Sequence, residues 1–426
     1  MKVYFSGISG TGIGPLAELA HDAGFEVFGS DLTRGAIADE LDKKGIEARY
    51  GEQDGNFLIQ KIETTGVDWL VHTSALPKQH RELQIARERN IKTSKRDEFL
   101  AELIRIKNLK MVAIAGTHGK TTTTAMLVWL FKTLNIPVSY LVGTTLGWAE
   151  SGKYDAESEY FIYEADEYDR NFLAFHPYIS AITTIDYDHP DIYPTREDYQ
   201  AAFRKFESQS DNVVKNTTLM HGVNLIGALR RIDGSLAVRC FGTILKKSQK
   251  NTEKTPNQAS ILDAINRFPG AGRRFEKIER GVISDYGHHP SEIALTLEMA
   301  RELKERDHYG GVAVIYQPHQ NTRQHEIRRE YKNAFTDAGK IFWLPTYLTR
   351  EDPQLEILSA DTLIKELDDH EKAEAAEMNE VLIHKLQQLH KANWLIVLLS
   401  AGPADQWLRE NLASITSERK TPSTNE

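Results

Sequence analysis

The sequence has almost no cysteine: Cys240 is the single one among 426 residues. One thiol excludes a disulfide framework and a cysteine metal cluster, and it fits a reducing compartment. Long apolar runs are also missing, since none approaches the ~20 residues that a membrane span needs. The apolar start at residues 3–5 is too short for a signal peptide. We therefore expect a soluble, cytoplasmic protein that has no membrane partner.

The chain also lacks a net positive charge. The chain has 52 Lys and Arg against 61 Asp and Glu, a formal charge of −9, which argues against a general nucleic-acid binder. Hydrophobic residues make up 40%, enough for packed cores. A chain of this length exceeds one core, so we expect two to four domains. No internal repeat at a fixed period is present.

Residues 111–124, Met-Val-Ala-Ile-Ala-Gly-Thr-His-Gly-Lys-Thr-Thr-Thr-Thr, are typical of a phosphate-binding loop. They predict a buried strand over 111–115, a glycine turn, and a helix that begins at Lys120 and runs to Phe131. Backbone N–H groups of such a turn favour an anion. The expected ATP-binding residues are Gly116, Thr117, His118, Gly119, Lys120, Thr121 and Thr122. Ile114 replaces one glycine of the full pattern, which leaves a plain turn with a solvated lysine as the alternative.

Acidic groups follow the next two predicted strands. Residues 160–163 form an apolar strand that ends in Glu164, and residues 179–185 form another that leads to Asp186, Asp188 and His189. A carboxylate at the end of a parallel strand beside a phosphate loop is suited to bind Mg²⁺. We therefore expect Thr121 and Glu164 to be metal ligands. For Glu164 the alternative is a solvated carboxylate, and for His189 a structural role.

The N-terminal region predicts a Rossmann-like unit that binds a nucleotide. Strands are expected over 2–6 and 26–28, with a helix over 15–23 and a glycine-rich turn over 7–14. Pro15 breaks the dinucleotide fingerprint, but Asp31 lies near the spacing at which an acid binds a ribose hydroxyl. A strand and loop over 67–75 and a helix over 92–103, which carries Arg96, complete the unit. A glycine turn that only packs a helix on a sheet is the alternative.

A third α/β unit is expected after the turn-rich residues 268–276. Strands are predicted over 282–285, 311–316, 340–344 and 393–399, and Ser291 is predicted to cap a helix that ends at Lys304. Residues 246–258 predict an exposed loop, and the polar tail a disordered end. The predicted boundaries are 1–107, 108–268, 269–416 and a tail over 417–426.

Six motifs together resemble the Mur ligases: Gly-Thr-His-Gly-Lys-Thr-Thr at 116–122, Glu-Ala-Asp-Glu at 164–167, Asp-x-Asp-His at 186–189, Gly-Arg-Arg-Phe at 272–275, Asp-Tyr-Gly-His-His-Pro at 285–290 and Gln-Pro-His-x-x-Thr-Arg at 317–323. The resemblance covers most of the chain, weakly over 208–260. It implies an α/β protein of three domains: a Rossmann-like N-terminal domain that binds a UDP-sugar, a central P-loop ATPase domain, and a Rossmann-like C-terminal domain that receives an amino acid.

The resemblance also implies roles for individual residues. The catalytic residues would be Lys120, Glu164, His189, Arg274 and Asp285, with His189 a ligand of a second Mg²⁺. Asn224 would contact adenine. The UDP-sugar would bind to Gly7, Gly10, Thr11, Gly12, Asp31, Ser74 and Arg96. His288, His319 and Arg323 would bind the amino acid.

The implied reaction joins L-alanine to the carboxylate of UDP-N-acetylmuramate, with ATP as co-substrate and Mg²⁺ as cofactor, in a monomer or homodimer. Two departures from the family pattern keep alternatives open. Gln320 stands where alanine-adding members carry arginine, and Asn321 and Thr322 resemble those that add a tripeptide. The central domain after His189 is short, which leaves a degenerate nucleotide-binding protein as an alternative. A small-molecule kinase would give residues 285–290 no role, and the broken fingerprint disfavours an NAD oxidoreductase.

Overall fold

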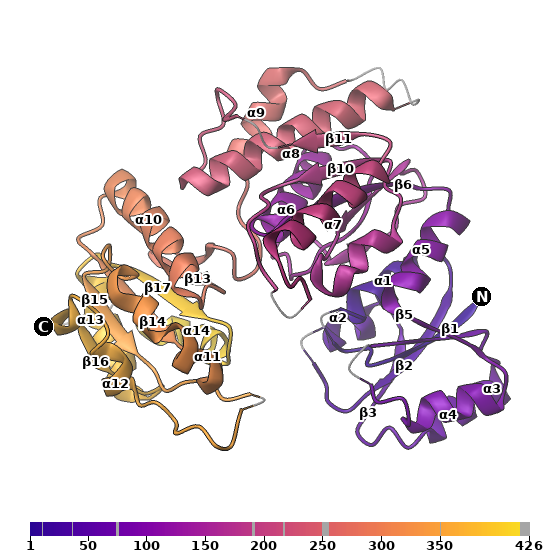
Figure 1. Ribbon diagram of the computed structural model, residues 1–426, viewed down its shortest axis with the longest axis horizontal. Helices are drawn as coiled ribbons and strands as arrows, with labels where there is room; N and C mark the ends of the chain where they lie inside the picture. The colour runs from indigo at the N-terminus through magenta and orange to yellow at the C-terminus, as the bar shows by residue number, and fades with distance from the viewer. Residues whose placement is uncertain are drawn as a thin grey trace, which may run out of the picture. The chain divides into compact units, whose positions relative to one another are not determined.

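The computed structural model describes residues 1–10, 12–35, 37–73, 76–189, 192–215, 218–248, 255–349 and 351–417. The chain forms two compact units: Met1–Val223 with Ile232–Phe268, and Asn224–Arg231 with Pro269–Glu426. Three sheets are present among the described residues, two in the first unit and one in the second (Figure 1). The fold class is therefore α/β, as expected. The predicted boundaries of three domains stay predictions.

The first sheet is parallel throughout and has the strand order β3-β2-β1-β4-β5. Its switch in strand order falls between β1 and β4, so loops diverge there at the carboxyl edge, where such folds bind ligands. The elements are β1 (Lys2–Ser6), α1 (Gly14–Asp22), β2 (Glu26–Asp31), α2 (Ala38–Lys43), β3 (Glu47–Tyr50), α3 (Asn56–Thr64), β4 (Trp69–His72), α4 (Arg81–Glu88), β5 (Lys92–Lys95) and α5 (Arg96–Ile106).

The second sheet has the order β11-β10-β6-β9-β7-β8, with only the β7–β8 pair antiparallel. The strand before the phosphate loop, β6, is central, between β9 and β10. The elements are β6 (Lys110–Ala115), α6 (Lys120–Thr133), β7 (Ser139–Leu141), β8 (Gly152–Lys153), β9 (Tyr160–Glu164), the 3₁₀ helix η1 (Tyr168–Ala174), β10 (Ile179–Ile182), α7 (Arg196–Ser208), β11 (Val213–Lys215), α8 (Ala228–Lys247) and α9 (Gln258–Asn266).

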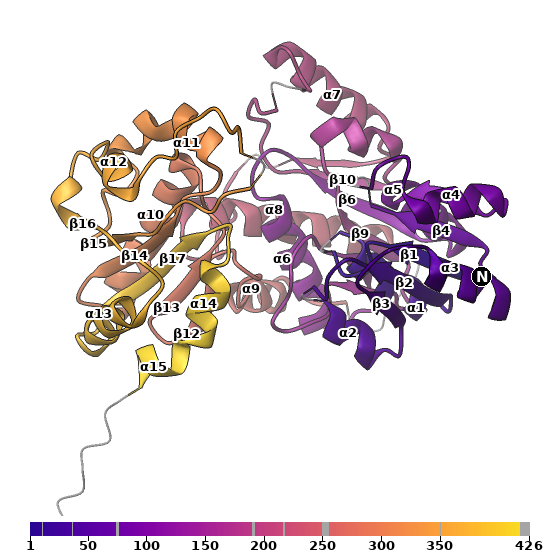
Figure 2. The ribbon, with the colours of Figure 1, turned by 90° about the horizontal axis from the view of Figure 1, so that it is seen from below.

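The third sheet has the order β12-β13-β17-β14-β15-β16, with only β12 antiparallel to its neighbour. In Figure 2, α10, α11 and α12 lie on one side of it and α13, α14 and α15 on the other, and each side has its own apolar core. The elements are β12 (Glu276–Glu279), β13 (Val282–Asp285), α10 (Pro290–Asp307), β14 (Val312–Gln317), α11 (Asn321–Ile327), η2 (Arg328–Asn333), β15 (Lys340–Trp343), α12 (Ala360–Ile364), η3 (His370–Lys372), β16 (Ala373–Ala375), α13 (Glu380–Lys391), β17 (Leu395–Ser400), α14 (Ala404–Glu410) and α15 (Leu412–Thr416).

Three predicted elements are corrected. Residues 92–95 are an edge strand paired with β4, not the start of a helix; an edge strand tolerates the polar Lys-Thr-Ser-Lys pattern, because its hydrogen bonds come from the backbone. The helix cap before α10 is His289, not Ser291, and Glu292 completes a capping box. The strand predicted over 179–185 ends at Ile182, and the loop that follows it packs on the phosphate loop.

Two predicted segments, the tail and the exposed loop, lie partly outside the described residues. Most of the predicted tail, 418–426, is outside them, as are 249–254 of the predicted loop over 246–258. Within the described residues, no helix is both long and apolar enough to cross a membrane.

Candidate active site

The phosphate loop lies between β6 and α6, and two of its residues need to be glycine. Gly116 has φ +138° and Gly119 has φ +82°, a region that residues with a side chain rarely adopt. A methyl group on Gly116 would also overlap the side chain of Thr183. The loop is held in place by the chain after β10: the N–H of Thr117 donates to the carbonyl of Thr184 (2.8 Å). This shape confirms the strand–turn–helix context that the sequence predicted.

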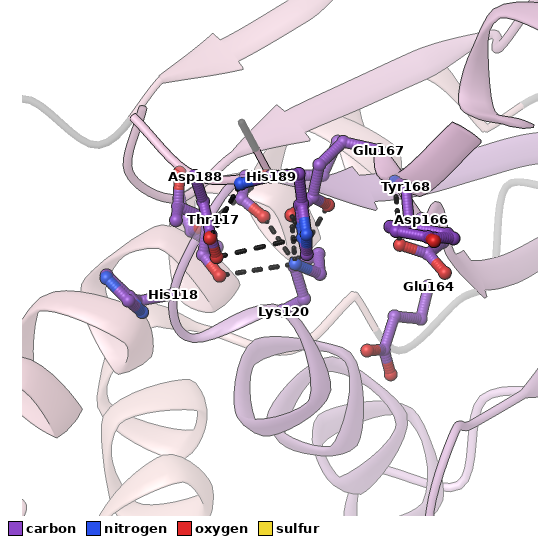
Figure 3. A network of polar contacts seen from close by, with 12 residues as sticks. Thr117, His118, Lys120, Glu164, Asp166, Glu167, Tyr168, Asp188 and His189 are labelled. Carbon is purple, nitrogen blue, oxygen red and sulfur yellow. Dashed lines mark hydrogen bonds and ion pairs between the residues drawn. The ribbon is translucent and has the colours of Figure 1, made fainter. Parts of the chain in front are cut away.

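Lys120 opens α6 and folds back over the loop (Figure 3). Its ammonium group donates to the carbonyls of Gly116 (2.7 Å) and Thr117 (3.2 Å). It also lies 2.9 Å from both carboxylate oxygens of Glu167. Lys120 is therefore at the phosphate loop, as predicted, and it is neutralised by an acid that the sequence interpretation did not single out.

Glu167 was missed because its position follows from the path of the chain after β9. Its side chain is 1% exposed, and burial raises its pKa while Lys120 opposes this. Asp169 and Arg170, two and three residues after Glu167, have φ of 51° and 58°, and nothing in the residue types predicts this left-handed turn. The one available signal was its place three residues after Glu164 in the same motif.

The Thr121 hydroxyl donates a 2.8 Å hydrogen bond to Glu164 Oε1. The other oxygen, Oε2, is buried and receives no hydrogen bond from any described residue. A buried carboxylate oxygen beside a hydroxyl is a donor set that fits Mg²⁺, which takes few protein ligands and completes its shell with water and phosphate. The described residues contain no group of three or more acidic, imidazole or thiol side chains at metal-binding distance. The two side chains therefore fit part of a Mg²⁺ site, and their role as metal ligands stays a prediction.

His189 lies near Glu167 at the end of the β10 loop. Its Nε2 is 3.8 Å from Glu167 Oε1 and 3.7 Å from Asp188 Oδ2. The ring also packs edge-on against Tyr168, with centroids 5.1 Å apart. The structure thus brings His189 to the same network as Lys120, while its predicted role as a metal ligand stays a prediction.

A cavity of about 820 Å³ lies at the carboxyl edge of the first sheet. Its lining includes five predicted UDP-sugar residues, Gly7, Gly10, Gly12, Asp31 and Arg96. Thr11 and Ser74, also predicted, lie outside the described residues. The second sheet contributes the residues that follow β9, namely Asp166, Tyr168, Asp169 and Asn171. The segment after β9 therefore contacts both this cavity and, through Glu167, the phosphate loop.

Two polar residues that line the cavity, Asp31 and Arg96, are fixed by hydrogen bonds to neighbouring residues. Asp31 accepts a hydrogen bond from the N–H of Ser9 (2.9 Å), which fixes the glycine-rich turn to the end of β2. Arg96 donates to the Tyr163 hydroxyl (3.2 Å) and to Asp97 (3.1 Å). Its guanidinium also faces Gly12, where an added Cβ would lie 3.1 Å from it. A side chain at position 12 would therefore push the guanidinium away by a few tenths of an ångström.

In the second unit, the predicted amino-acid residues His288, His319 and Arg323 lie together. Arg323 donates to Nε2 of His288, and the rings of His288 and His319 are 5.6 Å apart. Burial lowers the pKa of His288 to about 4, with Glu292 opposing and Arg323 adding to the shift. The imidazole is therefore neutral near pH 7, and its Nδ1–H donates to the Tyr286 carbonyl (3.2 Å).

Arg323 keeps an unbalanced charge in this cluster. No described carboxylate oxygen lies within 4.0 Å of its guanidinium, whereas Arg301, Arg306, Arg328 and Arg409 of the same unit each have one. An arginine without an acidic partner is suited to bind a carboxylate, because its planar fork matches the two oxygens. The cluster therefore fits the predicted site for an amino acid.

Arg274 lies just before β12, and Asp285 is the last residue of β13, its neighbour in the third sheet. The Arg274 guanidinium packs on the Tyr286 ring, 4.9 Å from its centroid. Asp285 is buried and accepts the N–H groups of Phe275 (2.6 Å) and Gly287 (2.7 Å). Burial raises its pKa, and these hydrogen bonds and Arg274 oppose the shift. Each oxygen of Asp285 thus accepts a hydrogen bond from the backbone. The catalytic roles of Arg274 and Asp285 stay predictions.

Of the remaining predicted ATP contacts, His118 and Thr122 lie at the phosphate loop and Asn224 lies in the second unit. His118 is exposed at the tip of the phosphate loop, and Thr122 is half-buried in the first turn of α6. Asn224 belongs to the second compact unit, and its contact with adenine stays a prediction.

Two family models match the chain: "Mur ligase family, catalytic domain" over residues 2–108 and "Mur ligase middle domain" over residues 114–218. Among curated proteins, the UDP-N-acetylmuramate–L-alanine ligase of Syntrophomonas wolfei is 31% identical over 403 residues, 82% of this chain and 83% of that protein. The Agrobacterium fabrum enzyme of the same name is 29% identical over 474 residues, 98% of this chain and 97% of that protein.

Solved structures show the same fold. The UDP-N-acetylmuramate–alanine ligase of Thermotoga maritima has a TM-score of 0.75 at 22% identity, over 97% of this chain and 98% of that chain. A murein peptide ligase of Psychrobacter arcticus has a TM-score of 0.60 at 20% identity, over 99% and 100%.

Proposed function

The chain belongs to the Mur ligase family, and from that membership we propose that it is an ATP-dependent ligase that joins L-alanine to the carboxylate of UDP-N-acetylmuramate. The observation that carries the proposal is the 31% identity with a curated alanine-adding ligase over 82% of the chain. The product of this reaction is a precursor of peptidoglycan.

The cavity at the edge of the first sheet is the proposed site of the UDP-sugar. The glycine-rich turn offers backbone N–H groups to a diphosphate, and Arg96 adds a cation beside it. Residues from the second sheet, Asp166 and Tyr168 among them, line the same cavity. A sugar nucleotide bound there would lie next to the segment that carries Glu164 and Glu167, so its carboxylate can be directed to the phosphate loop.

The phosphate loop is the proposed site of ATP. Its N–H groups and Lys120 would neutralise the charge that spreads over the transferred phosphoryl group, which is catalysis by positioning and electrostatics. Thr121 and Glu164 are the proposed ligands of Mg²⁺, with His189 the proposed ligand of a second ion. Bound Mg²⁺ would add further charge neutralisation at the phosphates.

The chemistry needs activation because a carboxylate is a poor electrophile. Transfer of the γ-phosphoryl group to the sugar carboxylate gives an acyl phosphate and ADP. The amine of L-alanine then attacks the acyl carbon, and inorganic phosphate leaves. Holding the reactants together contributes much of the acceleration.

The proposed amine site is the cluster of His288, His319 and Arg323. A neutral His288 that accepts from Arg323 holds the guanidinium in place, and the fork can bind the carboxylate of L-alanine. Asp285 and its hydrogen bonds to Phe275 and Gly287 would fix the backbone near Arg274.

The structure weakens one argument for the tripeptide as the amine. Asn321, which resembles the tripeptide-adding ligases, is 1% exposed. Its amide donates to the carbonyl of Glu356 (3.0 Å) and accepts from the N–H of Leu358 (2.9 Å). Its side chain therefore fixes the loop before α12, and its identity has a structural cause.

Phosphate release tests the proposal. With Mg²⁺, ATP, UDP-N-acetylmuramate and L-alanine all present, we expect steady release, and omission of either carbon substrate should remove it. A kinase would release no phosphate from the complete mixture, and a nucleotide-binding protein without ligase activity would give none under any condition.

A further inference from the structure

Lys120 has no free donor in the structure. An ammonium group has three protons, and those of Lys120 are used by the carbonyls of Gly116 and Thr117 and by Glu167. To bind a phosphate, Lys120 must release one of these partners. The two carbonyls belong to the loop that would wrap the phosphates, so Lys120 can keep them. Glu167 is an anion, as the phosphate is, and the two compete for the same proton.

Glu167 itself cannot follow the lysine or turn to solvent. Its carbonyl accepts from the Tyr193 hydroxyl (2.6 Å) and from the N–H of Arg170 (3.0 Å), so its backbone is fixed. Its side chain is 1% exposed. Once Lys120 turns to a phosphate, the carboxylate stays buried beside it, and Nε2 of His189 lies 3.8 Å from its Oε1 (Figure 3).

We propose that Glu167 is a positioning residue of the phosphate site, which holds Lys120 in the nucleotide-free protein and competes with the phosphates of ATP for its ammonium group. The inference rests on the proposed ATP-dependent function and adds a residue to it. Glu167 acts through Lys120 and need not touch the nucleotide.

If Glu167 and ATP compete for Lys120, removing the charge of Glu167 should raise the affinity for ATP. Replacing Glu167 with glutamine removes a charge but keeps the shape and an oxygen acceptor. In the nucleotide-free protein the change weakens the hold on Lys120. In the ATP complex it removes a buried negative charge beside the phosphates. Both effects favour the complex, so E167Q should bind ATP more tightly. A residue that only supports the fold would give weaker binding, or no change, when it is replaced.

Calorimetric titration of the full chain with ATP and Mg²⁺, without sugar nucleotide or amine, tests this. We expect E167Q to bind about tenfold more tightly than the unaltered protein, the scale of one charged hydrogen bond. E167D keeps the charge and should stay within about threefold of the unaltered protein by the same scale. The control is E157Q, which removes an exposed charge before β9, at the opposite end of that strand from Glu164 and Glu167. E157Q should also stay near the unaltered protein.

Equal or weaker binding by E167Q would overturn the inference, and so would equal tightening by E157Q. If E167Q does not fold, K120M and K120M/E167Q replace it, because removing both partners leaves no unpaired buried charge. The double variant should then bind ATP more tightly than K120M, since repulsion from Glu167 is gone; equal affinity would contradict the inference. If the unaltered protein binds no ATP at all, the proposed function fails instead.

Discussion

Thr121 and Glu164 are 43 positions apart in the sequence, yet the hydroxyl of one donates a 2.8 Å hydrogen bond to the carboxylate of the other. The contact forms because β6 and β9 are parallel neighbours, with Ile114 paired to Glu164. The helix that follows one strand and the residue that ends the other therefore meet at the carboxyl edge of the sheet. This pair is the core of the proposed Mg²⁺ site.

Glu164→Gln should raise the Mg²⁺ concentration needed for half-maximal turnover and lower turnover by about 10² or more, since an amide is a far weaker Mg²⁺ ligand. Phosphate release across a Mg²⁺ titration measures both effects. Glu157→Gln, which alters an exposed acid before β9, is the control. An unchanged Mg²⁺ dependence in Glu164→Gln would remove this residue from the site.

Lys120→Ala should slow ATP turnover by about 10² or more through loss of transition-state stabilisation. The protein should remain folded, but with a lower melting temperature, because Glu167 is left buried without its cation. Adding Glu167→Gln should restore the melting temperature but not the turnover. Lys205→Ala, on an exposed position of α7, should change neither. Near-normal phosphate release by Lys120→Ala would refute the assignment of the phosphate loop.

The phosphate loop and Glu164 could be predicted because each lies at the end of a strand whose apolar pattern is plain in the sequence. Glu167 could not, because the left-handed residues 169 and 170 set the path of the chain there. The strand β5 was missed for a different reason: its sequence is polar, and its pairing depends on backbone alone. The contact of Arg323 with His288 follows from β13 and β14 ending at one edge, but the choice of partner depends on side-chain packing.

Glu18 should make stability depend on pH. It is fully buried in α1, and neither carboxylate oxygen has a hydrogen-bond partner among the described residues. Burial raises its pKa from 4.5 to about 8; Lys44 opposes the shift, while Glu40, Asp22 and Glu150 add to it. The Tyr140 hydroxyl is buried nearby. Because the pKa of Glu18 is raised on folding, its contribution to the free energy of unfolding is fully present below pH 4.5. That contribution is lost as the pH rises through about 8.

Glu18→Gln removes this dependence, so its melting temperature should exceed that of the unaltered protein by several degrees at pH 8. The difference should shrink toward zero near pH 4.5. Thermal melts of both proteins over that range measure it. The exposed Glu26→Gln should show no such trend, and a constant difference for Glu18→Gln across the range would contradict the account.

Arg323→Lys should raise the KM for L-alanine about tenfold or more, because lysine keeps the charge but loses the two-donor fork. The KM for ATP should stay unchanged. Arg328→Lys, which alters an arginine near Glu366 after α11, is the matched control and should affect neither constant. A rise in the KM for ATP alone would show that Arg323 does not bind L-alanine.

The amine found in the product decides between L-alanine and a tripeptide as the substrate of this ligase. The protein is given saturating ATP and UDP-N-acetylmuramate with L-alanine and the murein tripeptide L-alanyl-γ-D-glutamyl-meso-diaminopimelate at equal concentrations, and the products are separated and weighed by mass spectrometry. We expect UDP-N-acetylmuramoyl-L-alanine to be the main product. A product that carries mainly the tripeptide would contradict this expectation.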